Sequence, residues 1–136
     1  MAEVIFKGRI RRLGRHDVTV SSAGLIDMKG KSADRNAVDA LLENGFEEAD
    51  HRSTLLTEDA VTRADLIVVM EGKQKKLITE AYPHAEAKIR LLKSFTKGYM
   101  EADSDIRDPY RMSAYHYRLC FSEIYLAVEG MMRSLE

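Results

Sequence analysis

The spacing of apolar residues predicts a helix at each end of the chain. Near the start, apolar positions recur every three or four residues from Ala2 to Leu13, and Gly14 follows where a left-handed residue would end such a helix. A longer stretch with the same period runs from Tyr117 to Leu135. Each segment is therefore predicted to bury one face against a core.

Capping and breaking residues predict three more helices between these two. Ser32 is placed to cap a helix that ends at Gly45, and Thr57 is placed to cap a shorter one. A lysine-rich helical pattern covers residues 71–81 and stops before a proline, because proline disfavours helical backbone at the residue before it.

Three short runs predict strands. Residues 17–23 are rich in β-branched side chains and lead into a glycine, residues 65–70 contain five consecutive apolar residues, and residues 88–92 are a third candidate. A continuous apolar run is typical of a parallel strand covered on both faces. The alternation of strands and helices predicts an α/β fold with three layers, helix, parallel sheet and helix, in which ligands bind beyond the carboxyl ends of the strands.

Composition narrows the class of protein. The chain has 136 residues, 45% hydrophobic and 32% charged, which predicts a single folded domain over residues 1–136. A formal net charge of −1 gives no long-range field for nucleic acid or an anionic membrane, so neither is expected as a partner. A single cysteine and the lack of a long apolar run favour a cytoplasmic location.

Three segments resemble the low-molecular-weight protein tyrosine phosphatase family, in particular its bacterial members. Their order and spacing extend along nearly the whole chain. They are Ser22-Ala23-Gly24 followed by Gly30-Lys31, then His51-Arg52-Ser53 with Leu56-Thr57 and residues 64–70, then Asp105-Ile106-Arg107-Asp108-Pro109-Tyr110-Arg111.

The resemblance assigns roles to five residues. Asp108 corresponds to the family's general acid, which protonates the leaving group and then activates water. Tyr110 and Met28 correspond to residues that contact the substrate, and Ser22 and His51 to residues that support the phosphate-binding loop. No metal and no cofactor are implied.

Other interpretations of the same aspartates stay open from the residues alone. Asp108 stands before a proline, a common way to start a turn. Asp105, in the loop expected over residues 93–111, is interpreted as a carboxylate that structures the loop rather than as a second acid.

The family signature, a cysteine followed after five residues by arginine and serine, does not occur in the 136 residues. The resemblance implies that this chain begins just after it, without the first central strand and the phosphate-binding loop. Cys120 has Leu126 six positions later instead of arginine and falls in an apolar helical stripe, so it is predicted to be a buried structural thiol.

The expected function is therefore that of a low-molecular-weight phosphatase family member whose full-length relatives hydrolyse phosphotyrosine-type monoesters on phosphorylated proteins through a cysteinyl-phosphate. This chain is expected to be catalytically incompetent. Alternatives are a natural pseudophosphatase that binds partners, a protein-arginine phosphatase, or an arsenate reductase relative. Without the central strand, residues 17–23 are expected to pair with residues 65–70, or a second copy to pair with the exposed sheet edges in a homodimer.

Overall fold

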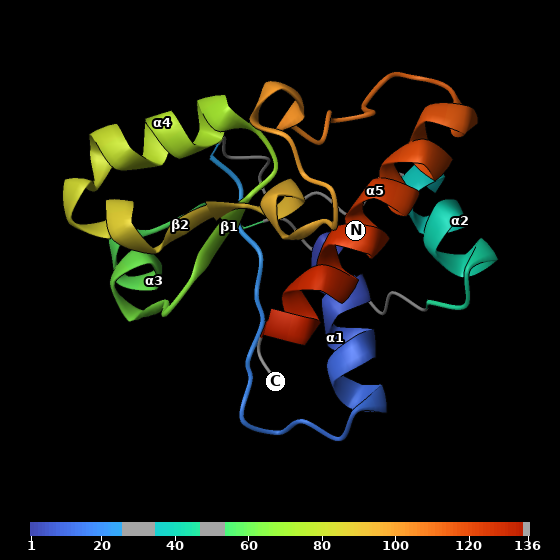
Figure 1. The fold of residues 1–136 in the computed structure, drawn as a ribbon, viewed down its shortest axis with the longest axis horizontal. Helices are drawn as coiled ribbons and strands as arrows, with labels where there is room; N and C mark the ends of the chain where they lie inside the picture. The colour runs from blue at the N-terminus through green and yellow to red at the C-terminus, as the bar shows by residue number, and fades with distance from the viewer. Residues whose placement is uncertain (26–34, 47–53, 135–136) are drawn as a thin grey trace. The chain divides into compact units, whose positions relative to one another are not determined.

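The computed structural model describes residues 1–25, 35–46 and 54–134 (Figure 1). The chain divides into two compact units, the first formed by residues 1–55 and 109–125 and the second by residues 56–108 and 126–136. The single domain expected over the whole chain stays a prediction, and each unit is described by itself.

The first helix, α1 (Ala2–Arg12), begins and ends where the apolar spacing predicts. Gly14 adopts a positive φ of 66°, and its N–H donates to the carbonyl of Arg11 over 3.2 Å. The N–H of Arg15 donates to the carbonyl of Ile10 over 3.1 Å. These two bonds satisfy carbonyls that the helix end would leave unpaired, as in a Schellman cap.

Helix α2 (Arg35–Glu43) ends in the same way, which confirms the predicted role of Gly45. Gly45 has a φ of 82°, its N–H donates to the carbonyl of Leu42 over 3.1 Å, and the N–H of Phe46 donates to the carbonyl of Leu41 over 2.9 Å. The cap therefore fixes the direction in which the chain leaves the helix. The predicted start at Ser32 lies outside the described residues.

The buried core residues of the first unit come mainly from α1, α2 and the first part of α5 (Ala114–Ser134). The apolar stripe predicted near the C-terminus is therefore confirmed as a buried helix face. The residues are Ile5, Phe6, Ile10, Ala40, Leu41, Tyr117, Cys120, Phe121 and Ile124.

The prediction of a strand at residues 17–23 is wrong. None of these residues is in a strand, none is buried, and they contribute nothing to the sheet that the structure describes. The nearest feature is a single parallel bridge between Gly24 and Leu55. A β-branched run forms a strand only where a ladder partner and a core face stabilise it, so the expected pairing of residues 17–23 with residues 65–70 is not formed either.

The second unit contains the parallel pairing that the apolar run predicts. Strands β1 (Ile67–Val69) and β2 (Ile89–Leu91) pair in parallel, with Val68 opposite Arg90. Both are shorter than the predicted runs, and within the described residues they make up a two-stranded sheet. Helix α4 (Gly72–Ala81) connects them and packs against both strands, so the unit is a strand, helix, strand element.

Helix α3 (Glu58–Arg63) begins at the predicted cap, where Oγ1 of Thr57 accepts a hydrogen bond from the N–H of Ala60 over 3.2 Å. Figure 1 draws α4 above the two strands and α3 below them. Side chains from all of these elements form one buried cluster, namely Val61, Val69, Ile78, Ala85 and Ile89.

Short 3₁₀ helices fill out the second unit. They are η1 (Pro83–Lys88), η2 (Leu92–Phe95) and η3 (Glu101–Asp103), and the last two fall at least partly within the segment 93–111 predicted as a long loop. The helices of the described residues include none with the length and apolar character that crossing a bilayer requires.

Candidate active site

The segment that carries Asp108 is attached to the carboxyl end of β1. The N–H of Ile106 donates to the carbonyl of Met70, the residue after the strand, over 2.8 Å. Oδ1 of Asp105 accepts a hydrogen bond from the N–H of Gly72, the first residue of α4, over 2.9 Å. Ile106 is fully buried between these contacts. The interpretation of Asp105 as a loop-structuring carboxylate is confirmed.

Asp108 itself is exposed, two residues after the buried Ile106. The carboxyl group of Asp108 is thus exposed, while the segment before it is held by one backbone hydrogen bond of Ile106 and one side-chain hydrogen bond of Asp105. Such a group can exchange protons with a bound molecule and with water, which is what general acid and base catalysis requires.

The next residues, in the first unit, form a tight turn. The N–H of Met112 donates to the carbonyl of Pro109 over 2.8 Å, and Arg111 has a positive φ of 65°. The guanidinium carbon of Arg111 lies 5.4 Å from the centre of the Tyr110 ring, within range of a cation–π contact. The ring of Tyr110 is 55% exposed, so it presents an aromatic surface to solvent.

Ser22 is held by residues far from it in the sequence. Its Oγ donates to Oε1 of Glu3 over 2.8 Å, and Glu3 also forms an ion pair of 3.0 Å with Lys7. On the backbone side, Oγ1 of Thr54 donates to the carbonyl of Ser22 over 3.2 Å, and the N–H of Gly24 donates to the carbonyl of Thr54 over 2.7 Å. These contacts fix the segment that leads out of residues 17–23.

Nothing in the sequence predicted Glu3 and Thr54 as partners of Ser22. The one local signal at Glu3 is its acidic side chain in the first turn of a helix. The helix dipole favours a negative charge at that place whether or not it has a partner. That signal explains its position in the helix but does not identify a partner 19 residues later.

The five residues expected at the site are distributed over both units. Ser22 and Tyr110 belong to the first unit and Asp108 to the second. Met28 and His51 lie outside the described residues. Their expected roles stay predictions.

Cys120 is 6% exposed on the buried face of α5, as predicted for a structural thiol. A nucleophilic cysteine needs access and a positive environment that lowers its pKa. Among the described residues, no three His, Cys, Asp or Glu side chains are arranged to hold a metal ion.

Comparison with known proteins gives one consistent family. The family model described as low molecular weight phosphotyrosine protein phosphatase matches residues 1–136. The chain is 40% identical over 94 residues to the probable low molecular weight protein-tyrosine-phosphatase EpsP of Ralstonia nicotianae, in an alignment that covers 69% of this chain and spans 61% of that protein's length. It is 31% identical over 135 residues to the protein-arginine-phosphatase of Bacillus subtilis, covering 99% of this chain and 84% of that protein.

Solved structures confirm the α/β class and the phosphatase-like fold. The low molecular weight protein tyrosine phosphatase from T. tengcongensis matches with a TM-score of 0.88 at 30% identity, covering 98% of this chain and 88% of that one. The chain belongs to the low molecular weight phosphotyrosine protein phosphatase family.

Proposed function

We propose that this chain is the body of a phosphate monoester hydrolase in which Asp108 is the general acid and base. In this mechanism its carboxyl group donates a proton to the leaving oxygen as the phosphorus–oxygen bond breaks, and its carboxylate then accepts a proton from the attacking water. The observation that carries the proposal is the attachment of the Asp108 segment to the carboxyl end of β1 through Ile106 and Asp105.

The proposal includes a cysteine nucleophile that these 136 residues do not supply. Hydrolysis through a cysteinyl-phosphate requires a thiolate below the phosphorus and backbone N–H groups with a guanidinium around the phosphoryl oxygens. The chain holds one cysteine, which is buried and has no arginine six positions later. We therefore expect this polypeptide alone to be catalytically incompetent.

Phosphotyrosine-type monoesters on proteins are the proposed substrates, with Tyr110 beside the substrate ring. A second candidate is phosphoarginine, because two of the relatives are protein-arginine-phosphatases that are 31% and 32% identical to this chain. Cleavage of phosphoarginine would place the proton from Asp108 on nitrogen instead of oxygen.

The test compares two polypeptides in the hydrolysis of para-nitrophenyl phosphate. One is the 136-residue chain, for which we expect no turnover above the uncatalysed rate. The other carries, before Met1, the strand and the Cys-x5-Arg-Ser loop of a phosphatase relative, and we expect it to be active. Asp108→Asn in this fusion should lower kcat by about 10²- to 10⁴-fold, the usual contribution of a general acid.

Two outcomes would contradict the proposal. Turnover by the 136-residue chain that is lost in Asp108→Asn would show that the cysteine loop is dispensable. A correctly folded fusion that binds phosphate without turnover would favour the pseudophosphatase alternative. Phosphotyrosine and phosphoarginine peptides, assayed side by side with the active fusion, decide between the two substrate classes.

We also propose that a second copy of the chain pairs with the strands at the sheet edges. Among the described residues β1 pairs with β2 alone, so each strand has one side without a ladder partner. Sedimentation of the purified chain should give the mass of a dimer. A single species with the mass of one chain at micromolar concentrations would contradict this.

A further inference from the structure

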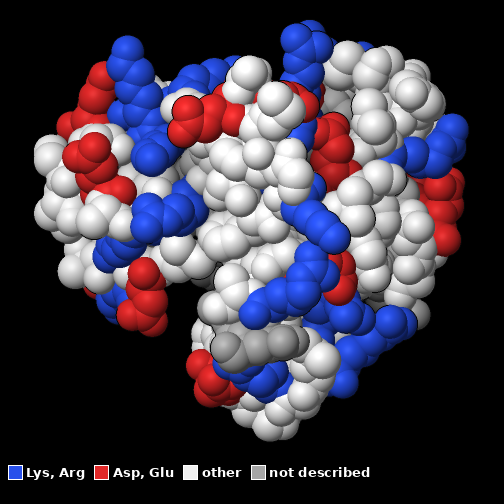
Figure 2. All heavy atoms as spheres, viewed as in Figure 1, with Lys and Arg blue, Asp and Glu red and all other residues white. Residues whose placement is uncertain are grey.

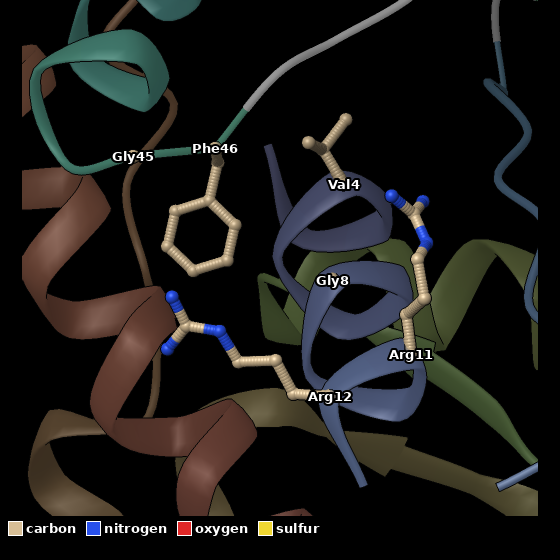
Figure 3. Close-up of a pocket in the computed structure, with 6 residues that line it drawn as sticks. All are labelled: Val4, Gly8, Arg11, Arg12, Gly45 and Phe46. Atoms are coloured by element: carbon tan, nitrogen blue, oxygen red, sulfur yellow. The ribbon is translucent and has the colours of Figure 1, made fainter. Parts of the chain in front are cut away.

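A cavity of about 320 Å³ opens within the first unit, between one face of α1 and the turn that follows α2 (Figure 3). It lies in a part of the chain to which the proposed mechanism assigns no role. Four lining residues belong to α1 and two to the turn: Val4, Gly8, Arg11, Arg12, Gly45 and Phe46.

The apolar wall of this cavity is built by the helix cap of α2. Phe46 follows Gly45, and its N–H takes part in the cap, which holds the residue in place. A Cβ added to Gly8 would lie only 3.0 Å from two carbons of the Phe46 ring. Glycine at position 8 therefore allows the ring to lie close to the helix. The ring also packs against Phe121 and Tyr125, with centroid distances of 5.9 and 6.2 Å, which holds the wall in place.

The two arginines give the cavity a positive rim. Arg11 and Arg12 are exposed, and neither forms an ion pair within the part of the chain that the structure describes. By contrast, Lys7 on the same helix pairs with Glu3, and Arg15 just after the helix pairs with Asp17. In Figure 3 the guanidinium of Arg12 lies on the side of Phe46 and that of Arg11 on the side of Val4.

The positive charge is a local feature of a chain whose formal net charge is −1. Residues 4–16 contain five Lys and Arg residues and no acidic residue. Figure 2 shows Lys and Arg side chains gathered over the region in which Figure 1 draws α1.

We propose that this cavity binds an acidic peptide segment in which one apolar side chain is flanked by carboxylates. The apolar side chain would contact the ring of Phe46 and the side chain of Val4, and the carboxylates would pair with Arg11 and Arg12. Guanidinium groups pair well with carboxylates because their planar N–H donors match the two oxygens. An apolar wall between two charges suits a peptide better than a nucleic acid, whose binding requires an extended positive surface.

The experiment uses nuclear magnetic resonance titration of the 136-residue chain with the capped tripeptide Glu-Phe-Glu. We expect saturable shifts of the Gly8 and Gly45 amide signals, and much weaker binding of the neutral tripeptide Gln-Phe-Gln. The double variant Arg11→Gln/Arg12→Gln should bind the acidic peptide about tenfold more weakly, as expected for two partly exposed ion pairs.

The matched control is Lys75→Gln/Lys76→Gln, which removes two adjacent positive charges from α4 and should leave the affinity unchanged. Gly8→Ala is a second variant. Its methyl group would displace the Phe46 ring that forms the wall, so it should weaken binding of the acidic peptide. Equal binding of the acidic and neutral peptides, equal loss in both double variants, or the same shifts with inorganic phosphate alone would overturn the proposal. None of these measurements depends on catalysis, so they are independent of the proposed hydrolase function.

Discussion

Gly130 in α5 approaches the carbonyl oxygen of Phe95 so closely that a Cβ at position 130 would lie 1.9 Å from that oxygen. The obstructing atom is backbone, so a side chain at this position can be accommodated only if α5 or η2 moves. The contact explains why a residue that weakens helices stands inside the C-terminal part of a 21-residue helix.

Gly130→Ala is therefore expected to destabilise the protein, although the same change in an open helix position stabilises it by about 1 kcal/mol. Overpacking against a fixed neighbour costs about 1–3 kcal/mol, so the free energy of unfolding should fall. Urea denaturation measures it, with Ser122→Ala on the exposed side of the same helix as the control. A rise in stability for Gly130→Ala would contradict the close approach.

Lys88 is expected to stabilise the end of α3. Its Nζ donates to the carbonyls of Ala64 and Thr62, over 2.8 and 3.3 Å, and these carbonyls lack helix partners. Lys88→Met keeps the aliphatic stem and removes the donor, and we expect a loss of about 1 kcal/mol in the free energy of unfolding. Lys76→Met, at an exposed position of α4, should change it by less than about 0.5 kcal/mol. Equal changes in the free energy of unfolding for the two substitutions would contradict the capping role of Lys88.

Asp105 is expected to act as a positioning residue for Asp108. Asp105→Ala removes the acceptor for the N–H of Gly72 and should cost about 1 kcal/mol of stability, whereas Asp105→Asn keeps an oxygen in that place and should cost less. In the active fusion, kcat should fall roughly tenfold for the alanine variant, because the loop would lose one of its two attachments, and recover in the asparagine variant. A kcat that is the same in both variants would contradict this role.

The hydrogen bond between Ser22 and Glu3 is expected to appear as an energetic coupling. Ser22→Ala and Glu3→Ala, measured singly and together by urea denaturation, should give an interaction energy of about 0.5–1 kcal/mol. The cycle of Ser22→Ala with Asp59→Asn is the control, since Asp59 pairs with Arg63 in the other unit. Strictly additive effects for the first pair would show that the hydrogen bond contributes nothing.

Asp17 is expected to titrate at an unusually low pH. The side-chain hydrogen bonds from Arg15, at 2.7 and 2.8 Å, lower the pKa of this carboxyl from 3.8 to about 2. Because the folded pKa is the lower one, the stabilising effect is complete above pH 3.8 and is lost as the pH falls through about 2.

Nuclear magnetic resonance of the carboxyl carbon measures the midpoint for Asp17. Arg15→Gln should raise this midpoint towards 3.8, and Arg63→Gln should leave it unchanged. A midpoint near 3.8 in the unmodified chain would contradict the pairing.

The helices and their ends could be predicted from the sequence because the signals are local. Gly14, Gly45 and Thr57 act through hydrogen bonds that span three to five residues, and the structure confirms each of them. The apolar run at 65–70 likewise predicted a parallel strand, because burial on both faces leaves a continuous apolar pattern in the sequence.

The candidate site could be predicted only as a set of residue types. The Asp108 segment is positioned by Met70 and Gly72, more than 30 residues earlier, and Ser22 is held by Glu3 and Thr54. None of these pairs has a fixed spacing that a pattern could detect.

By itself, the sequence determined the bounds of α1, the end of α2, the cap of α3, the parallel character of the sheet and the phosphatase family. Only the tertiary structure decided that residues 17–23 form no strand, that Phe46 and two arginines border one cavity, and that Gly130 must have no side chain. The physical reason is distance along the chain. A cap is completed by neighbours within one turn, whereas a ladder, a cavity wall or a close backbone approach depends on segments that meet only after folding.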